Sequence, residues 1–156
     1  MIEVSLWPIL AAGIAATLLG WVWYHPKVFG THWMRMSNIT PEMAEAGKRR
    51  MPLMALVGLL AAMLVAYVMS YFGVAWGVYD FIGAIELGFW SWIGFVAPTM
   101  LGSVLWDQKP FRLYLINTLY WLVALIVMAI ILVVGSQTFG GDSLYDTSTG
   151  SSYVGE

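Results

Sequence analysis

Cysteine is absent from the chain. This absence excludes disulfides, thiolate metal sites, a cysteine nucleophile and a lipid-modified cysteine. Charge is also scarce, because only 10% of the 156 residues are Asp, Glu, Lys or Arg, whereas a soluble domain has about 25%. The net charge of −2 gives no general attraction to nucleic acid, and we expect none among the partners.

Histidine is nearly absent too, with His25 and His32 as the only two. They lie seven residues apart, across a proline and a glycine, which matches no standard metal-binding spacing. We therefore expect no metal and no cofactor, and we interpret His25 as a residue of the membrane interface. No nucleotide-binding glycine loop and no Ser/His/Asp set can be assembled, so we expect a protein without enzymatic activity.

Apolar residues, in contrast, make up 60% of the chain. Four segments have no Lys or Arg in their centres and reach the roughly 20 residues that cross a bilayer: about residues 5–24, 52–72, 81–105 and 110–134. Each must be helical, because a lone segment in lipid satisfies its backbone hydrogen bonds only as a helix. The sequence predicts an all-α integral membrane four-helix bundle over residues 1–134, followed by a polar acidic tail at 135–156.

The basic residues predict the orientation. All seven lie in the two connections that share one side of a four-span protein: Lys27, Arg35, Lys48, Arg49, Arg50, Lys109 and Arg112. Short loops rich in Lys and Arg stay in the cytoplasm. We therefore predict cytoplasmic basic loops, with both termini and the tail on the other side.

The first of these connections is long enough to hold a helix of its own. Thr40, Pro41 and Glu42 form a typical helix start, since threonine caps, proline suits the first position and glutamate complements the dipole. We predict a short cytoplasmic interfacial helix over residues 41–50. The basic end of this helix consists of Lys48, Arg49 and Arg50. These residues either only set the orientation in the membrane or also bind anionic lipid headgroups.

Glu86 is the single acidic residue inside a predicted span. Carboxylates within a membrane often mark proton or cation pathways. A structural or interfacial role competes with this interpretation, because Glu86 lies only about 9 Å by helical rise from the outer end of its span. Both remain open at this point.

A polar and aromatic stripe marks the fourth predicted span. Asn117, Tyr120 and Trp121 follow the three- and four-residue spacing that places side chains on one helix face. Asparagine can form hydrogen bonds between helices in a membrane. We interpret the stripe as a contact between helices, with a ligand contact as the alternative.

Two further patterns are typical of close helix packing. Small residues at four-residue spacing let helix backbones approach each other. We expect packing roles for Ala12, Ala16 and Gly20 in the first span, and for Gly94, Pro98 and Gly102 in the third. Pro98 is also expected to kink or loosen its helix.

Two stretches of the chain look familiar as combinations of polar and aromatic residues. The first is Trp23-Tyr24-His25-Pro26 with Phe29-Gly30 and Trp33-Met34. The second is Gly94 to Pro98, then Leu105-Trp106 and Pro110, then Arg112-Leu113, Ile116-Asn117 and Tyr120. Over roughly residues 5–134 they resemble a bacterial membrane family catalogued as domain of unknown function 1761. The resemblance implies a four-helix membrane protein in the bacterial inner membrane, with no established activity, and it adds Arg112 to the candidate contacts.

Two hypotheses for function come from these patterns. The favoured one is a non-catalytic accessory or scaffold subunit that packs against a larger membrane complex, because the spans are rich in aromatic residues and poor in charge. Its partners would be the lipid bilayer and other membrane subunits, or further copies of the chain. The alternative is a small oligomeric transporter or channel that uses Glu86.

Overall fold

The computed structural model describes residues 6–139, and every regular element within that range is helical. In chain order these are α1 (Leu6–Trp23), the π-helical turn η1 (Pro26–Gly30), α2 (Thr31–Met36), α3 (Pro41–Lys48), α4 (Met51–Ala75), α5 (Phe81–Ser91), the π-helical turn η2 (Trp92–Val96), α6 (Ala97–Leu105) and α7 (Phe111–Phe139). Residues 1–5 and 140–156, including most of the predicted tail, lie outside the described part.

Four helical stretches are long and apolar enough to cross a membrane. They are α1, α4, the continuous stretch α5–η2–α6 and α7. The predicted integral membrane four-helix bundle is therefore confirmed. The helix α7 continues to Phe139, beyond the residue 134 at which we placed the end of the fourth span.

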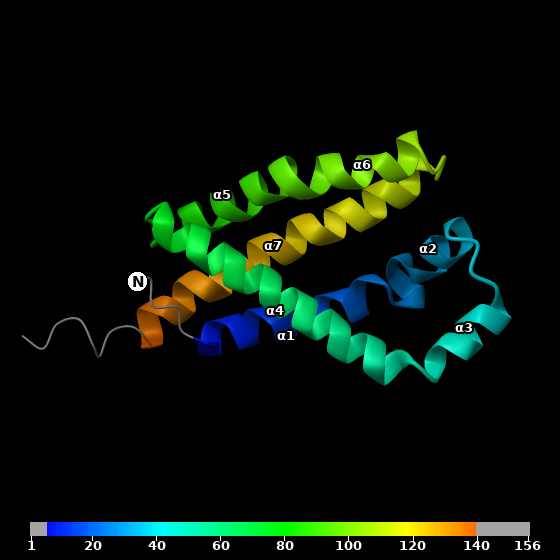
Figure 1. The fold of residues 1–156 in the computed structure, drawn as a ribbon, viewed down its shortest axis with the longest axis horizontal. Helices are drawn as coiled ribbons and strands as arrows, with labels where there is room; N and C mark the ends of the chain where they lie inside the picture. Colours follow the sequence, from blue (N-terminus) through cyan, green and yellow to red (C-terminus); the bar gives the residue numbers. More distant parts are fainter. Residues whose placement is uncertain (1–5, 140–156) are drawn as a thin grey trace, which may run out of the picture.

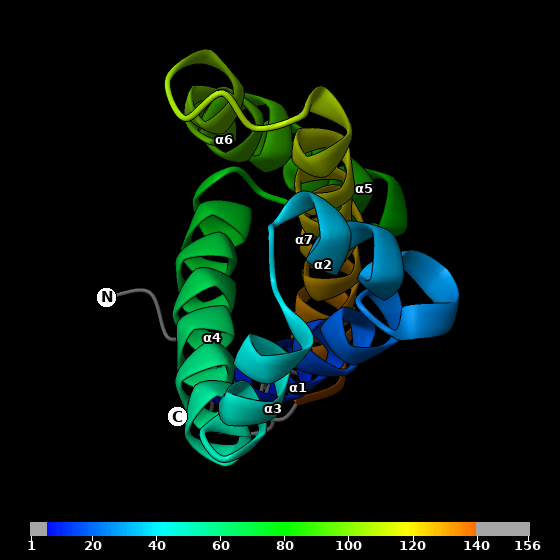
Figure 2. The ribbon, with the colours of Figure 1, turned by 90° about the vertical axis from the view of Figure 1, so that its right-hand side faces the viewer.

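The helix α7 lies between two neighbours (Figures 1 and 2). It packs along α1 on one side and along α5 on the other, and α4 packs mainly on α1. The helices α4 and α5 are joined by a short hairpin, from which they diverge in Figure 1. The short helices α2 and α3 lie at the opposite end of the bundle from that hairpin.

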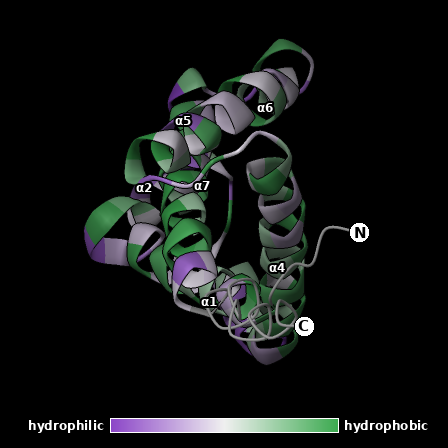
Figure 3. Cartoon of the chain, turned by 90° about the vertical axis from the view of Figure 1, so that its left-hand side faces the viewer, coloured by the Kyte–Doolittle hydropathy of each residue, from purple (hydrophilic) through white to green (hydrophobic). Residues whose placement is uncertain are grey.

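The core consists largely of small side chains. Alanines that are buried almost completely come from all four spans: Ala12, Ala16, Ala66, Ala84, Ala124 and Ala129. Many large apolar side chains are exposed on the outside of the bundle, and Figure 3 shows apolar residues along all the long helices. In lipid, apolar outer faces cost nothing, so close approach of helix backbones rather than burial of large side chains organises the bundle.

Turn and capping residues in the connections behave as their chemistry predicts. In the hairpin, Gly77 has a φ of +67°, which glycine adopts without strain. The Asp80 carboxylate then accepts a hydrogen bond of 2.9 Å from the Gly83 amide at the start of α5. At the other end, the Thr40 hydroxyl accepts one of 3.3 Å from the Met43 amide and starts the predicted interfacial helix, α3.

The third span changes its helical pitch in the middle. The π-helical turn η2 begins after Ser91 and ends just before Ala97 and Pro98, which open α6. Proline lacks the N–H group that an uninterrupted α-helix would use at that position. A π-helical turn is one of the ways in which a helix accommodates such a break.

The helices α5 and α7 cross at very short distance. A Cβ atom built on Gly88 would lie 2.7 Å from the Ile126 Cα and 2.8 Å from its amide nitrogen. Real Cβ atoms do not approach backbone atoms that closely. Glycine at position 88 therefore sets the distance between the two helices.

We expect Gly88→Ala to lower the free energy of unfolding by roughly 1–3 kcal/mol, because the added methyl group overpacks the crossing. The matched control is Gly58→Ala in α4, where a Cβ atom meets nothing within 4 Å; there alanine should stabilise the helix by up to about 1 kcal/mol. Unfolding in SDS, followed by circular dichroism, measures both. Equal effects at the two sites would contradict the close crossing.

Candidate functional site: an aromatic cluster on α7

The end of α1 meets α7 in a group of aromatic hydrogen bonds, which we name the aromatic cluster (Trp23, Tyr24, Asn117 and Tyr120). The Tyr24 hydroxyl donates to the Asn117 Oδ1 atom at 3.1 Å. The Trp23 Nε1–H group donates to the Ile116 carbonyl oxygen at 3.1 Å. The Tyr120 hydroxyl completes the group by donating to the Ala16 carbonyl oxygen, also at 3.1 Å.

The rings of the aromatic cluster also contact one another. The ring centroids of Tyr24 and Tyr120 lie 5.4 Å apart, and those of Trp23 and Tyr120 lie 6.3 Å apart. Beyond α1, Trp33 lies edge-on to Tyr24 at 5.4 Å and Phe29 lies 4.9 Å from Trp23. These centroid distances fall in the range of favourable aromatic pairs.

The turn η1 holds the two outer rings in place. His25 is its N-cap, and the imidazole Nδ1 atom accepts a hydrogen bond of 3.2 Å from the Lys27 amide. Gly30 is buried, and a Cβ atom there would collide with the Tyr24 carbonyl group. The motif from Trp23 to Trp33 therefore folds back on the end of α1 because position 30 carries no side chain.

A second small residue makes room for the Tyr120 ring. A Cβ atom on Gly20 would lie 3.3 Å from the Tyr120 hydroxyl oxygen and 3.6 Å from the ring. A methyl group at position 20 would require the ring or the helix to shift by a few tenths of an ångström. Gly20 thus serves the hydrogen bond of Tyr120.

Two more aromatic donors join the third span to the same segment of α7. The Trp92 Nε1–H group lies 2.7 Å from the Thr118 carbonyl oxygen and 2.9 Å from the Thr118 hydroxyl oxygen. The Tyr114 hydroxyl donates to the Ala97 carbonyl oxygen at 3.1 Å. Residues 114–120 of α7 are therefore hydrogen-bonded on both sides.

The other candidate contacts differ in their position relative to this cluster. Glu86 and Arg112 are both exposed, and neither takes part in a hydrogen bond or ion pair within residues 6–139. Trp121 is half-buried and packs edge-on against Tyr120 at 5.4 Å. Asn117, Tyr120 and Trp121 are thus together, while His25 lies at the nearby turn and Glu86 lies near the hairpin end of α5.

The basic segment before α4 faces solvent. Lys48, Arg49 and Arg50 are exposed, and Lys48 forms an ion pair of 2.6 Å with Glu45, which is exposed as well. Such pairs contribute little to stability. At the start of α3, a hydrogen bond with the Thr40 side chain holds the pKa of Glu42 below its ordinary value. Within residues 6–139, Arg49 and Arg50 form no ion pair.

The predicted packing residues occupy different surroundings. Ala12 and Ala16 are almost completely buried, with exposed fractions of 0% and 1%. A Cβ atom on Gly94 would meet nothing within 4 Å, and one on Gly102 would meet only Trp106 of its own segment at 3.6 Å. Pro98 is exposed. Within residues 6–139, no three His, Asp or Glu side chains lie close enough to hold a metal ion.

Sequence reasoning missed Thr118, the partner of Trp92, and Ser91, which is discussed below. Both are small hydroxyl residues in apolar spans and therefore match no catalytic or metal-binding motif. The one sequence signal that could have indicated them is their neighbours inside a span: Ser91 lies between two tryptophans, and Thr118 follows Asn117. Chemically, the N–H and O–H groups of the three aromatic members already donate hydrogen bonds within the protein, which suits holding helices together.

The fold and this cluster define an integral membrane protein of four spans whose helices are held by aromatic hydrogen bonds. A family model described as a protein of unknown function (DUF1761) matches residues 7–133. The chain belongs to this family, as the resemblance of its two motifs implied. No curated protein and no solved structure matches the chain.

We expect the hydrogen bond between Tyr24 and Asn117 to stabilise the bundle by roughly 0.5–1.5 kcal/mol, as interhelical bonds do in membranes. A double-mutant cycle of Tyr24→Phe and Asn117→Ala, with unfolding in SDS as the measurement, gives this coupling energy. The control is Tyr67→Phe on α4, whose side chain is 48% exposed and should change stability by less than about 0.5 kcal/mol. A coupling energy of zero would show that the contact does not stabilise the protein.

Proposed function

We propose that this protein is a non-catalytic subunit of a membrane complex, and that α5 is the helix that contacts the partner. The observation that carries the proposal is the position of Glu86 on an otherwise apolar outward face. We name this surface the α5 outer face (Ile82, Glu86, Phe89 and Trp90), and all four side chains are exposed. Their spacing of three, four and seven residues places them on one side of the helix.

Lipid is an unfavourable neighbour for the Glu86 carboxylate on this face. Glu86 lies five residues after Phe81, where α5 begins, which is about 7.5 Å along the helix axis. An ionised side chain facing hydrocarbon costs about 2.5–3.5 kcal/mol at the centre of a span, and less near its end. A partner helix that donates hydrogen bonds to the carboxylate removes this cost.

A different protein suits the α5 outer face better than a second copy. The Lys and Arg residues of the chain lie in or beside the connections at the α2–α3 end, whereas Glu86 lies near the α4–α5 hairpin. Two copies related by a twofold axis through this face would bring their Glu86 carboxylates together without a cation. We therefore infer a partner that supplies an Arg, a Lys or another hydrogen-bond donor to Glu86.

The interior of the bundle supports a role in assembly more than one in transport. Within residues 6–139, Ser91 and Thr118 are the only polar residues that are buried, and the Thr118 hydroxyl is already paired with Trp92. A chain of polar groups through one copy is thus missing from the described part. The transporter alternative would need a pathway between copies, with Glu86 facing it.

The compartment and orientation are part of the proposal. We propose a bacterial inner membrane protein whose basic loops, which contain α2, α3 and the connection between α6 and α7, lie in the cytoplasm. The support is the family resemblance and the placement of all seven basic residues in or directly beside these two connections.

The partner is tested by native gel separation of gently solubilised membranes, with mass spectrometry of the band that contains this chain. We expect co-migration with a larger complex, and we expect Trp90→Ala to weaken that complex by about 30-fold, the usual effect of losing a central aromatic contact. The matched control is Trp21→Ala on α1, because Trp21 and Trp90 are similarly exposed at 63% and 60%. Migration as a monomer in the unchanged protein would refute the proposal.

The transporter alternative makes a different prediction. If copies assemble around Glu86 and conduct protons or cations, Glu86→Gln should abolish the flux in reconstituted vesicles while the oligomer persists. Flux that is absent from both proteins, or unchanged by the substitution, would exclude this role for Glu86.

Orientation can be tested cleanly because the chain has no cysteine. We expect Ala46→Cys in α3 to be protected from a membrane-impermeant maleimide in intact cells, and Tyr79→Cys in the α4–α5 hairpin to be labelled. Both residues are exposed in the structure, so lysed cells should label both variants and provide the control. The opposite pattern would reverse the proposed topology.

A further inference from the structure

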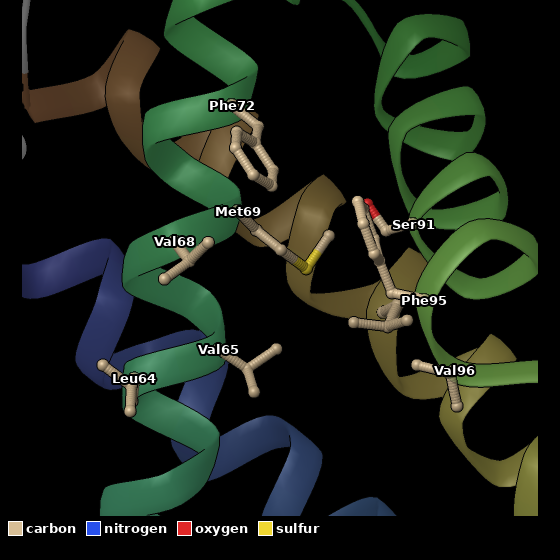
Figure 4. Close-up of a pocket in the computed structure, with 9 residues that line it drawn as sticks. Leu64, Val65, Val68, Met69, Phe72, Ser91, Phe95 and Val96 are labelled. Carbon is tan, nitrogen blue, oxygen red and sulfur yellow. The ribbon is translucent and has the colours of Figure 1, made fainter. Parts of the chain in front are cut away.

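A membrane-facing groove separates α4 from the third span. It has a volume of about 380 Å³, and its walls are formed by side chains between Leu64 and Phe72 of α4 and between Ser91 and Val96 of α5 and η2. Leu125 of α7 also lines the groove, and Figure 4 shows the side chains of its two walls. The groove exists because α4 and α5 diverge from their hairpin and contact each other little. Its volume is in the range of small-molecule sites, which are likewise mostly apolar.

Ser91 is the one lining residue with a polar side chain. It is only 6% exposed, and within residues 6–139 its hydroxyl is the only buried side-chain polar atom without a hydrogen-bond partner. Figure 4 shows this hydroxyl directed towards the groove, beside the ring of Phe95. An unpaired buried hydroxyl costs about 1–3 kcal/mol, so a ligand that pairs with it gains affinity.

Several other Ser and Thr hydroxyls in the spans behave differently. Thr17 donates to the Gly13 carbonyl oxygen at 2.9 Å, and Ser103 donates to the Met100 carbonyl oxygen at 2.8 Å. Such bonds to the preceding turn are the usual way in which a helix satisfies Ser and Thr. Ser91 is the last residue of α5, and its hydroxyl faces the groove instead of that turn.

The depth of Ser91 restricts the class of ligand. Ser91 lies ten residues after Phe81, about 15 Å along the span and hence near the middle of a hydrocarbon core about 30 Å thick. The ester carbonyl groups of a phospholipid are anchored at the surface and do not reach this depth. A ligand that pairs with Ser91 must carry its oxygen atom to the middle of the bilayer.

Two aromatic rings indicate the shape of that ligand. Phe72 of α4 and Phe95 of η2 extend from opposite walls, with ring centroids 6.5 Å apart and planes inclined by only 22°. Phe95 is 61% exposed, so its ring has room to turn outwards. A flat ring that enters between them would stack on both faces.

From these observations we propose that the groove binds a lipid quinone, a neutral molecule with carbonyl oxygens on a flat ring and an apolar tail. The ring lies between Phe72 and Phe95, and a ring carbonyl oxygen accepts a hydrogen bond from the Ser91 hydroxyl. The tail follows the apolar wall of α4 along Leu64 and Val65. Binding of this neutral molecule needs no charged group in the site, and it requires no redox step by the protein.

The test is isothermal titration of the full chain in phospholipid nanodiscs with a decyl-substituted benzoquinone, with empty nanodiscs as the baseline for partitioning. We expect saturable binding of one molecule per chain. Ser91→Ala should weaken binding by about 3–10-fold, the effect of one lost neutral hydrogen bond. Val65→Trp, which fills the groove, should abolish it.

Matched controls separate these effects from general damage to the fold. Ser103→Ala removes a hydroxyl of the same span that is bonded to its own helix, and Leu60→Trp adds a tryptophan to an exposed position of α4 outside the groove. Both should bind like the unchanged protein. Absence of saturable binding, or equal affinity of the Ser91→Ala variant, would overturn the proposal. Native mass spectrometry that finds a phospholipid in the groove, lost in Val65→Trp, would overturn it as well.

Discussion

The close contact of α7 with helices on both sides is the interaction on which the rest of the structure depends. Lipid removes the hydrophobic force that drives helices together in water, so packing and hydrogen bonds must do this work. Alanines and Gly88 allow the backbones to approach, and aromatic N–H and O–H groups bond across the crossings to residues 114–120 of α7. The three helices α1, α7 and α5 therefore form one unit.

The helix α4 is joined to this unit in another way. It packs on α1, where a Cβ atom on Gly13 would meet the Met63 side chain at 2.7 Å, but within the described residues its side chains make no hydrogen bond to another span. It is therefore the helix that is free to diverge from the third span. The groove beside Ser91 follows from this arrangement.

Sequence patterns could predict part of the aromatic cluster. The spacing of Asn117, Tyr120 and Trp121 places them on one face of α7, and the motif from Trp23 to Trp33 stands out by its composition. Their pairing could not be predicted, because Tyr24 and Asn117 are 93 residues apart and no local rule links them. The groove was equally hidden, since Ser91 is one hydroxyl among several and its lack of a partner depends on the surrounding helices.

The sequence by itself determined the number of spans, their approximate ends, the short helix α3 and the grouping of basic residues at two connections. Each of these follows from local composition, because an apolar segment in lipid must be helical whatever its neighbours are. Only the tertiary structure decided which faces meet, which buried hydroxyl stays unpaired and that Glu86 points outwards. The physical reason is that these helices are apolar on all sides, so hydrophobic periodicity carries no information about the face that packs.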